Sequence, residues 1–234
     1  MNIIPLAGKS SRFKAAGYLT PKYLLDFQGK SILEHILYAF SLSERLLCIV
    51  NVNDEALQGV TEIIVRCGFH DFDVVELDDT QGQLETVYLG MIMSRFTLFE
   101  EHIWIFNGDT IRRSAPPEGI FVGDGPDIVV EVFNQSGDHW SFVDTLGNFS
   151  RIAEKQRISS YCSTGLYGFK SGKLLIDFME SNRISLVAGE LYVSGFIADM
   201  ILKGFKGYSF LSPLNDFLLA GTPEEYEQLL DLNV

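Results

Sequence analysis

Through the first half of the chain, short apolar runs alternate with segments whose apolar residues recur at helical spacing. The apolar runs are residues 2–6, 46–50, 72–77 and 103–106. The helical segments between them are residues 31–40, a segment that Asp54 caps and Gly68 ends, and residues 83–93. This alternation predicts an α/β fold with a Rossmann-like, mostly parallel (mixed) sheet and helices on both faces.

After Thr110 the pattern changes to a stretch rich in proline and glycine, followed by strand-like pieces. Strands are predicted at residues 128–133, 140–144, 149–153, 163–169 and 208–211, with a turn at 146–148. Helices are predicted at residues 173–180, 193–202 and 223–230, the last with Thr222 as its N-cap. No linker or repeat interrupts the chain, so we expect one domain over residues 1–234.

Composition and charge narrow the class of protein. The 234 residues are 47% hydrophobic and 21% charged, which is typical of one soluble domain. The net charge of −13 argues against a nucleic-acid partner, because a phosphate backbone requires a basic surface. No apolar stretch is long enough to span a membrane, and no basic region precedes the amino-terminal apolar run. Three cysteines without metal-type spacing also fit a reducing compartment, so we expect a cytoplasmic protein.

The first apolar run ends in a loop of small residues followed by two basic ones. The small residues are Ala7, Gly8, Ser10 and Ser11, and they would let successive backbone N–H groups turn toward an anion. Arg12 would add a fork of donors and Lys22, after Pro21, a compact positive charge. The residues suit a triphosphate cradle, but they equally suit a surface junction with solvated basic side chains.

This stretch resembles the signature of the nucleotidyltransferases that make nucleotide-sugars, in particular their short bacterial members in capsule and surface-polysaccharide synthesis. The matching motifs are Ala7-Gly8, Ser11-Arg12-Phe13, Ala16-Gly17-Tyr18, Pro21-Lys22 and Gly29-Lys30. Ser10 departs from the pattern, since the family has its second loop glycine there. The resemblance implies a nucleotide-diphospho-sugar transferase (GT-A-like) fold, with Arg12 and Lys22 catalytic. It places on the nucleotide Leu6, Ala7, Gly8, Ser10, Ser11, Arg12 and Lys22.

The segment Asn107-Gly108-Asp109 follows the apolar run at 103–106. A carboxylate at the end of a central strand lies over the same crevice as the loop, and it suits Mg²⁺ that carries a nucleotide phosphate. From sequence alone, an aspartate in a turn is the commoner situation. The resemblance implies that Asp109 is a catalytic metal ligand and that Asn107 and Gly108 contact the nucleotide.

The segment Gln81-Gly82-Gln83 lies between a predicted strand and a predicted helix. Gly82 would permit the close approach of a flat ligand, and the two glutamine amides could read the edge of a base. The same residues are also a good start for a helix. The segment is similar to the base-reading segment of the family, which implies contacts with the nucleotide.

Further motifs of the family occur in the second half of the chain. The resemblance places Glu154 on acceptor hydroxyls and Lys155 on the acceptor phosphate, and it places Gly165 and Glu190 in the acceptor pocket. Trp140 would form an apolar wall there, although a tryptophan in the core is as common. It follows that residues 1–115 hold the nucleotide and residues 116–234 the acceptor.

The carboxyl-terminal segment resembles the closing Gly-Thr-Pro-Glu motif of the family at Gly221-Thr222-Pro223-Glu224. Many relatives carry a second metal-binding aspartate two residues before that glycine, where this chain has Leu219. Asp216 is the nearest carboxylate and is therefore the candidate second metal ligand. The alternatives are fewer protein ligands or reduced activity.

Together the motifs predict an enzyme that transfers a nucleoside monophosphate from an NTP to a small phosphorylated acceptor, such as a sugar 1-phosphate, with Mg²⁺ and release of pyrophosphate. The alternatives are a cytidylyltransferase acting on a non-sugar phosphate such as phosphocholine, and a non-catalytic nucleotide binder. A glycosyltransferase is disfavoured, because Asn107-Gly108-Asp109 lacks the paired aspartates of that class. The sequence does not specify the base, the acceptor or the oligomeric state, and it is compatible with a homo-oligomer.

Overall fold

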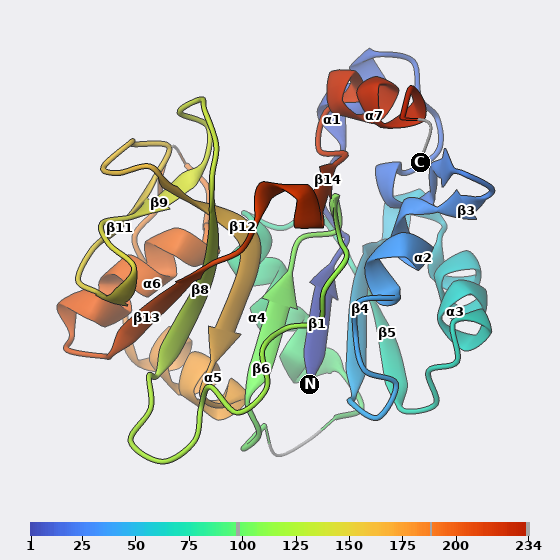
Figure 1. The fold of residues 1–234 in the computed structure, drawn as a ribbon. Helices are drawn as coiled ribbons and strands as arrows, with labels where there is room; N and C mark the ends of the chain where they lie inside the picture. The colour runs from blue at the N-terminus through green and yellow to red at the C-terminus, as the bar shows by residue number, and fades with distance from the viewer. Residues whose placement is uncertain (97–98, 188, 233–234) are drawn as a thin grey trace.

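The computed structural model describes residues 1–96, 99–187 and 189–232. Its central sheet follows the order β10-β13-β8-β12-β6-β1-β4-β5, with β9 and β11 attached beside β12 (Figure 1). The first half supplies β1 (Asn2–Pro5), β4 (Leu46–Asn51), β5 (Phe72–Leu77) and β6 (Ile103–Phe106), all mutually parallel. Because β8 and β13 point the same way as these strands and β12 runs against them, the sheet is mixed but mostly parallel, as predicted.

The alternation of side chains along the strands divides the interior into two cores. Ile3 of β1 belongs to the core beneath α4 (Gln83–Met93), α5 (Gly172–Ser181) and α6 (Val193–Leu202). Ile4, its neighbour, belongs to the core beneath α2 (Ile32–Leu37) and α3 (Leu57–Arg66). Since successive side chains of a strand point to opposite faces, an apolar run such as β1 fills both cores at once. Helices therefore cover both faces of the sheet, as the alternation predicted.

The second half of the chain extends the same sheet. It contributes β8 (Ile128–Asn134), β9 (Ser141–Val143), β10 (Gly147–Phe149), β11 (Ile152–Glu154), β12 (Tyr161–Phe169) and β13 (Gly207–Leu211). The predicted strand at 149–153 is wrong, because β10 pairs with β13 while β11 pairs with β9. The predicted turn at 146–148 is wrong as well, since Gly147 and Asn148 are paired residues of β10.

Most helix boundaries agree with the prediction, and their caps explain why. Ser31 and Thr222 each form a capping box with the glutamate three residues on, at the start of α2 and of α7 (Pro223–Leu230). The predicted N-cap at Asp54 is wrong, because α3 begins three residues later, after Ala56. The Asp54 carboxylate accepts a hydrogen bond from Tyr23 and pairs with Lys14, so it is not available as a cap.

Short elements carry the remaining loops. They are α1 (Ser11–Ala15), the hairpin of β2 (Asp26–Phe27) and β3 (Lys30–Ser31), the pair β7 (Thr110–Arg112) and β14 (Phe217–Leu219), and the 3₁₀ turns at Lys22–Leu24, Val52–Asp54 and Leu214–Asp216. The β7–β14 pair brings the carboxyl-terminal segment back to the end of β6 (Figure 1). None of the helices in the described part of the chain is long and apolar enough to cross a membrane.

A buried ion pair links β7 to β8 of the central sheet. Arg112 of β7 donates to Glu131 of β8 at 2.7 Å, and both side chains are at most 1% exposed. Thr164 and Ser212 also donate to the Glu131 carboxylate, whereas the Nε and Nη1 atoms of Arg112 are buried without a hydrogen-bond partner among the described residues. The pair therefore ties β7, β8 and β12 together through one carboxylate.

Replacing Glu131 with glutamine should lower the free energy of unfolding by about 3 kcal/mol or more, because the Arg112 charge would stay buried without a counter-charge. Urea denaturation measures the change. Asp177→Asn is the matched control, since Asp177 pairs with Lys173 on the surface and should contribute within about 0.5 kcal/mol. Equal stability of the two variants would contradict a structural role for the buried pair.

Candidate active site

Two adjoining cavities form a continuous cleft over the carboxyl ends of β1 and β6. The first, of about 690 Å³, is bordered by residues 5–11, 80–83 and 107–109, and we call it the loop cavity. The second, of about 440 Å³, reaches from the same loop to β9, β11 and β12, and we call it the strand cavity. Lys22 and Asp109 line both cavities and therefore mark their junction. This is the crevice in which open α/β sheets bind ligands.

The loop after β1 lines both cavities with small residues, among them Gly8, Ser10 and Ser11. Ser10 has φ 47° and ψ 33°, in the left-handed region, and it immediately precedes α1. The serine therefore adopts the conformation for which a glycine would be favoured. Arg12, in α1, lines the strand cavity and is exposed.

Replacing Ser10 with glycine should raise the free energy of unfolding by roughly 0.5 to 1 kcal/mol, because the left-handed strain of a residue with a Cβ is relieved. Chemical denaturation measures this change. The control is Ser11→Gly, which places a glycine in the first turn of α1 and should destabilise the protein. Destabilisation by both substitutions would mean that the strain at position 10 is offset by contacts of the serine side chain.

Lys9 is a basic residue of the loop that the sequence analysis did not single out. Its Nζ lies 3.1 Å from Asp79, which also accepts a hydrogen bond from Asn51. Lys9, followed by Asn51, lowers the pKa of the Asp79 carboxyl, so that group stays ionised. The contact connects the loop after β1 to the segment after β5 along the rim of the loop cavity.

Lys22 and Asp109 form the central charged contact of the cleft. The Nζ of Lys22 donates to Oδ2 of Asp109 at 2.5 Å, and each side chain is less than a quarter exposed, at 22% and 24%. Asp109 follows β6 and Lys22 starts the 3₁₀ turn after Pro21, as their places in the sequence suggested. A Cβ on Gly221 would come within 3.3 Å of Oδ2 of Asp109 and of Oε2 of Glu225, so the glycine leaves space beside both carboxylates.

Asp216 is not brought to Asp109. The backbone of Asp216 accepts a hydrogen bond from Arg113, and its carboxylate accepts one from Ser114 at 3.5 Å, outside the cleft lining. Leu219, three residues further on, pairs with Thr110 and lines the strand cavity. A separation of three residues along a strand is about 10 Å, so Asp216 lies away from the position that Leu219 occupies.

Asn107 is fixed between the two cavities by two neighbours. Its Oδ1 accepts a hydrogen bond from Gln83 Nε2 at 2.6 Å. A Cβ on Gly165 would lie 2.2 Å from the Asn107 amide, so Gly165, with φ 88°, leaves room for that side chain. The space that we assigned to an acceptor is therefore occupied by Asn107, although Gly165 still lines the strand cavity.

Gly82 lies at the start of α4, where the sequence predicted the close approach of a base. A Cβ there would lie 2.6 Å from the carbonyl oxygen of Leu191. Leu191 also donates to Gln81 and accepts from Leu84 through its backbone. The close approach is thus made by the segment before α6, while Gln81, Gly82 and Gln83 line the loop cavity.

Glu154 is held at the end of β11 by two hydroxyl groups. Ser141, its partner in β9, and Ser194 of α6 both donate to Oε2 of Glu154, Ser194 at 2.7 Å. Tyr167 of β12 lies 3.4 Å from Ser141 Oγ, and burial raises the pKa of its hydroxyl to about 12. The carboxylate is therefore oriented within the strand cavity by neutral hydroxyl donors.

Lys155, with φ 53°, follows β11 and donates from Nζ to the Tyr192 hydroxyl at 2.5 Å. This hydrogen bond is the main cause that raises the pKa of Lys155, so the ammonium stays charged. Burial first, and then a hydrogen bond with Glu190, raise the pKa of Tyr192. Trp140 lines the same cavity, with its ring edge-on to Phe133 at 5.2 Å. Lys155, Glu190 and Trp140 thus line one cavity.

Comparison with solved structures identifies the family. A nucleoside-diphosphate-sugar pyrophosphorylase from Vibrio cholerae RC9 aligns over 99% of this chain and 100% of that chain, with a TM-score of 0.90 and 33% sequence identity. The chain belongs to the nucleoside-diphosphate-sugar pyrophosphorylase family. It is therefore a nucleotidyltransferase, as the motifs predicted.

More distant solved structures share the fold. An inositol-1-phosphate CTP transferase from T. maritima covers 98% of this chain and 94% of its own, with a TM-score of 0.75 and 17% identity. A UDP-glucose pyrophosphorylase complexed with UDP-glucose covers 98% of this chain and 96% of its own, with a TM-score of 0.76 and 12% identity. No protein-family model and no curated protein matches the chain. The predicted fold class is confirmed by the sheet and by these pyrophosphorylase structures.

Several residues that line the cleft of this pyrophosphorylase-family chain were missed by sequence reasoning. They are Lys9, His139, Ser141, Tyr167 and Ser194. Lys9 did carry a signal, since it is a basic residue inside the phosphate-type loop. Ser141, Tyr167 and Ser194 carried none, because they come together only through the pairing of β9 with β11 and β12 and the packing of α6 on β11.

Proposed function

We propose that this nucleotidyltransferase joins a nucleoside monophosphate from an NTP to the phosphate of a small acceptor, most simply a sugar 1-phosphate. An acceptor phosphate oxygen attacks the α-phosphorus of the NTP, a new P–O bond forms, and the bond to the β-phosphate oxygen breaks. Pyrophosphate leaves with that electron pair. The observation that carries the proposal is the Lys22–Asp109 pair at the junction of the two cavities. Each cavity also has a basic side chain in its wall, Lys9 in the loop cavity and Lys155 in the strand cavity.

The loop cavity is proposed to hold the NTP. The loop from Leu6 to Ser11 would place its backbone N–H groups along the triphosphate. Lys22, at the junction of the cavities, and Arg12, which borders the strand cavity beside the same loop, would neutralise charge on the leaving pyrophosphate. Gln81, Gly82 and Gln83 would contact the base from the opposite wall, with Asn107 and Gly108 beneath the ribose side. The hydrogen bond between Gln83 and Asn107 fixes both amides before the ligand arrives.

The donor set at the junction fits Mg²⁺ held together with substrate phosphates. Mg²⁺ commonly takes one or two protein carboxylates and completes its shell with phosphate oxygens and waters. Asp109 supplies such a carboxylate, and no group of three or more metal-binding side chains occurs in the described residues. The ion would neutralise charge on the triphosphate. The geometry does not support Asp216 as a second ligand, and the glycine at 221 leaves the space beside Asp109 open to ligand oxygens.

The strand cavity is proposed to hold the acceptor. Lys155 would bind its phosphate, and Glu154 would accept hydrogen bonds from its hydroxyls, with Glu190 close to Tyr192 at the rim. In this arrangement residues 1–115 would bind the nucleotide and residues 116–234 would bind the acceptor. Catalysis would come from alignment of the two substrates and from fixed charges, since no covalent intermediate is required.

A second candidate acceptor is a phosphate ester of a quaternary amine, such as phosphocholine, which would receive CMP from CTP with release of pyrophosphate. The observation that favours it is the set of rings from His139, Trp140, Tyr167 and Tyr192 around one cavity with Glu154. Aromatic faces attract quaternary ammonium groups. The motif resemblance supports instead a nucleotide-sugar used for surface polysaccharide in the cytoplasm, and we retain the sugar 1-phosphate as the principal proposal.

A screen of pyrophosphate release with Mg²⁺ tests these proposals. It crosses CTP, UTP, GTP, dTTP and ATP with sugar 1-phosphates, inositol 1-phosphate and phosphocholine. We expect release in one pairing, dependent on both substrates. Nucleotide binding without release in any pairing would support instead a non-catalytic binder, for which Ser10 and Leu219 are the departures to restore.

A further inference from the structure

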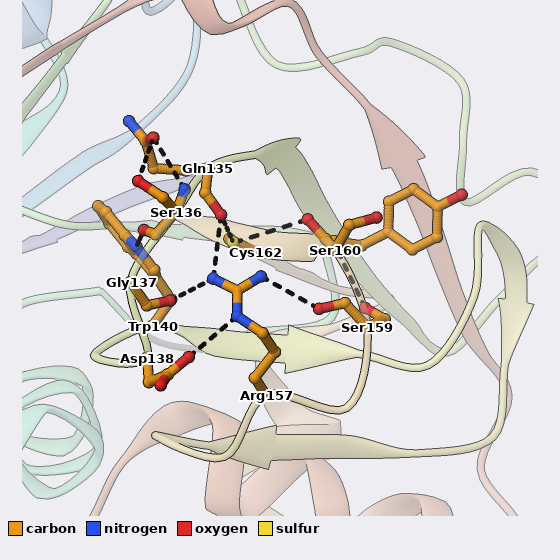
Figure 2. A network of polar contacts seen from close by, with 10 residues as sticks. Gln135, Ser136, Gly137, Asp138, Trp140, Arg157, Ser159, Ser160 and Cys162 are labelled. Atoms are coloured by element: carbon orange, nitrogen blue, oxygen red, sulfur yellow. Dashed lines mark hydrogen bonds and ion pairs between the residues drawn. The ribbon is translucent and has the colours of Figure 1, made fainter.

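One arginine ties two loops at the far end of the strand cavity. Arg157 lies in the loop between β11 and β12, and its Nε donates to the Asp138 carboxylate at 2.9 Å (Figure 2). Its Nη2 donates to the carbonyl oxygens of Gln135, at 3.1 Å, and Gly137, and its Nη1 donates to that of Ser159 at 3.3 Å. The guanidinium therefore bonds to three residues of the β8–β9 loop and to one of its own loop.

Two further contacts support the same arrangement. The Arg157 guanidinium lies 4.7 Å from the centre of the buried Phe142 ring, which fixes its plane. The Cys162 thiol donates to the Gln135 carbonyl at 3.4 Å, so that oxygen accepts from two neighbours (Figure 2). The Arg157 side chain is only 33% exposed, although Asp138 is 77% exposed. The ion pair with Asp138 is thus a surface contact, while the carbonyl contacts define the loop.

The loop held in this way carries the rings of the acceptor end. Trp140 comes directly before β9, and its Nε1 donates to the Ser136 carbonyl at 3.0 Å. His139 lies against Trp140 with ring centres 4.4 Å apart, and both rings line the strand cavity. The Trp140 carbonyl in turn accepts from the backbone N–H of Lys155 at 2.9 Å. Arg157 therefore sits behind both the ring wall and the lysine that we assign to the acceptor.

We propose that Arg157 is a positioning residue that fixes the β8–β9 loop and thereby the acceptor end of the cleft. The inference rests on the proposed function in taking the strand cavity as the acceptor site. Arg157 itself is absent from the residues that line the cavity, so it acts through Trp140, His139 and Lys155.

The geometry of a guanidinium explains why arginine serves here. Its planar fork presents donors in several fixed directions at once, whereas a lysine ammonium is a compact point charge. A lysine at 157 could keep the attraction to Asp138, but it could not bond to the carbonyls of Gln135, Gly137 and Ser159 in one plane. Charge and geometry can therefore be separated by comparing Arg157→Ala with Arg157→Lys.

The test uses two measurements on the full chain. Acrylamide quenching of tryptophan fluorescence follows the loop, because the chain has two tryptophans and Trp104 is 2% exposed. Steady-state kinetics with the substrate pair from the pyrophosphate screen gives a KM for each substrate. Arg151→Ala is the matched control, since Arg151 is exposed and its side chain donates a long hydrogen bond of 3.4 Å to Gln156.

Both Arg157 variants should show stronger quenching and a KM for the acceptor raised by about tenfold, with the KM for the NTP within about twofold of the wild type. Arg151→Ala should match the wild type in both. Unchanged quenching, equal rises in both KM values, or full recovery in Arg157→Lys would overturn the proposal. If the wild type turns over no pair, the proposed function fails, and unchanged quenching in the Arg157 variants still overturns the positioning role of Arg157 independently.

Discussion

Replacing Asp109 with asparagine should lower the turnover number by roughly a thousandfold or more, because charge stabilisation at the reacting phosphates is the main source of catalysis in this account. Asparagine has the same shape and can still accept the hydrogen bond from Lys22, so the fold should be retained. Pyrophosphate release at saturating NTP and acceptor measures the effect. Raising the Mg²⁺ concentration should not restore the rate.

Asp124→Asn controls for the loss of one negative charge, since Asp124 is exposed and does not line the cleft. Its rate should equal that of the wild type. A rate for Asp109→Asn within about tenfold of the wild type would remove this carboxylate from the chemistry. Circular dichroism of both variants checks that any loss of rate is not a loss of folding.

Replacing Lys22 with methionine should lower kcat/KM by roughly a hundredfold to a thousandfold, since the charge is proposed to stabilise the leaving pyrophosphate. The contact of 2.5 Å with Asp109 adds a second expectation. In the absence of nucleotide, the variant should bind Mn²⁺ more tightly than the wild type, because the Asp109 carboxylate is no longer paired with an ammonium. Titration followed by electron paramagnetic resonance measures that affinity without turnover.

Lys14→Met is the matched control for Lys22→Met. Lys14 lies in α1 but outside the lining of either cavity, and its contact with Asp54 is long, at 3.9 Å. The control should keep normal kinetics and normal Mn²⁺ affinity. A Lys22 variant with unchanged Mn²⁺ affinity would show that the ammonium does not compete for Asp109, even if the rate falls.

Local patterns were sufficient for most elements of the fold. The bounds of β5, α4, β6, α6 and α7 agree with the prediction. Gly82 precedes α4 and Thr222 caps α7, so the sequence marks where these two helices begin. The strand predicted at 149–153 failed for a non-local reason. Its two ends pair with β13 and β9, which are far from each other in the sequence, so the chain changes partners between them.

The site shows the same limit. The motifs led to residues that the structure gathers around one cleft, including Arg12, Lys22 and Asp109. They could not give the reason for the glycines, because Gly82 and Gly165 leave room for Leu191 and Asn107, which come from distant parts of the chain. Nor could they exclude Asp216, whose separation from Asp109 depends on the register of β14 against β7.

The fate of the α-phosphate tests the proposed transfer most directly. An NTP labelled with ³²P at the α-position is incubated with the acceptor found in the screen, and the products are separated. We expect all of the label that leaves the NTP to appear in one new product, in which the nucleotide is linked to the acceptor. Unlabelled pyrophosphate should form in an equal amount, and neither product should form when the acceptor is omitted. Label in free nucleoside monophosphate, or pyrophosphate formed without acceptor, would contradict transfer to a phosphorylated acceptor.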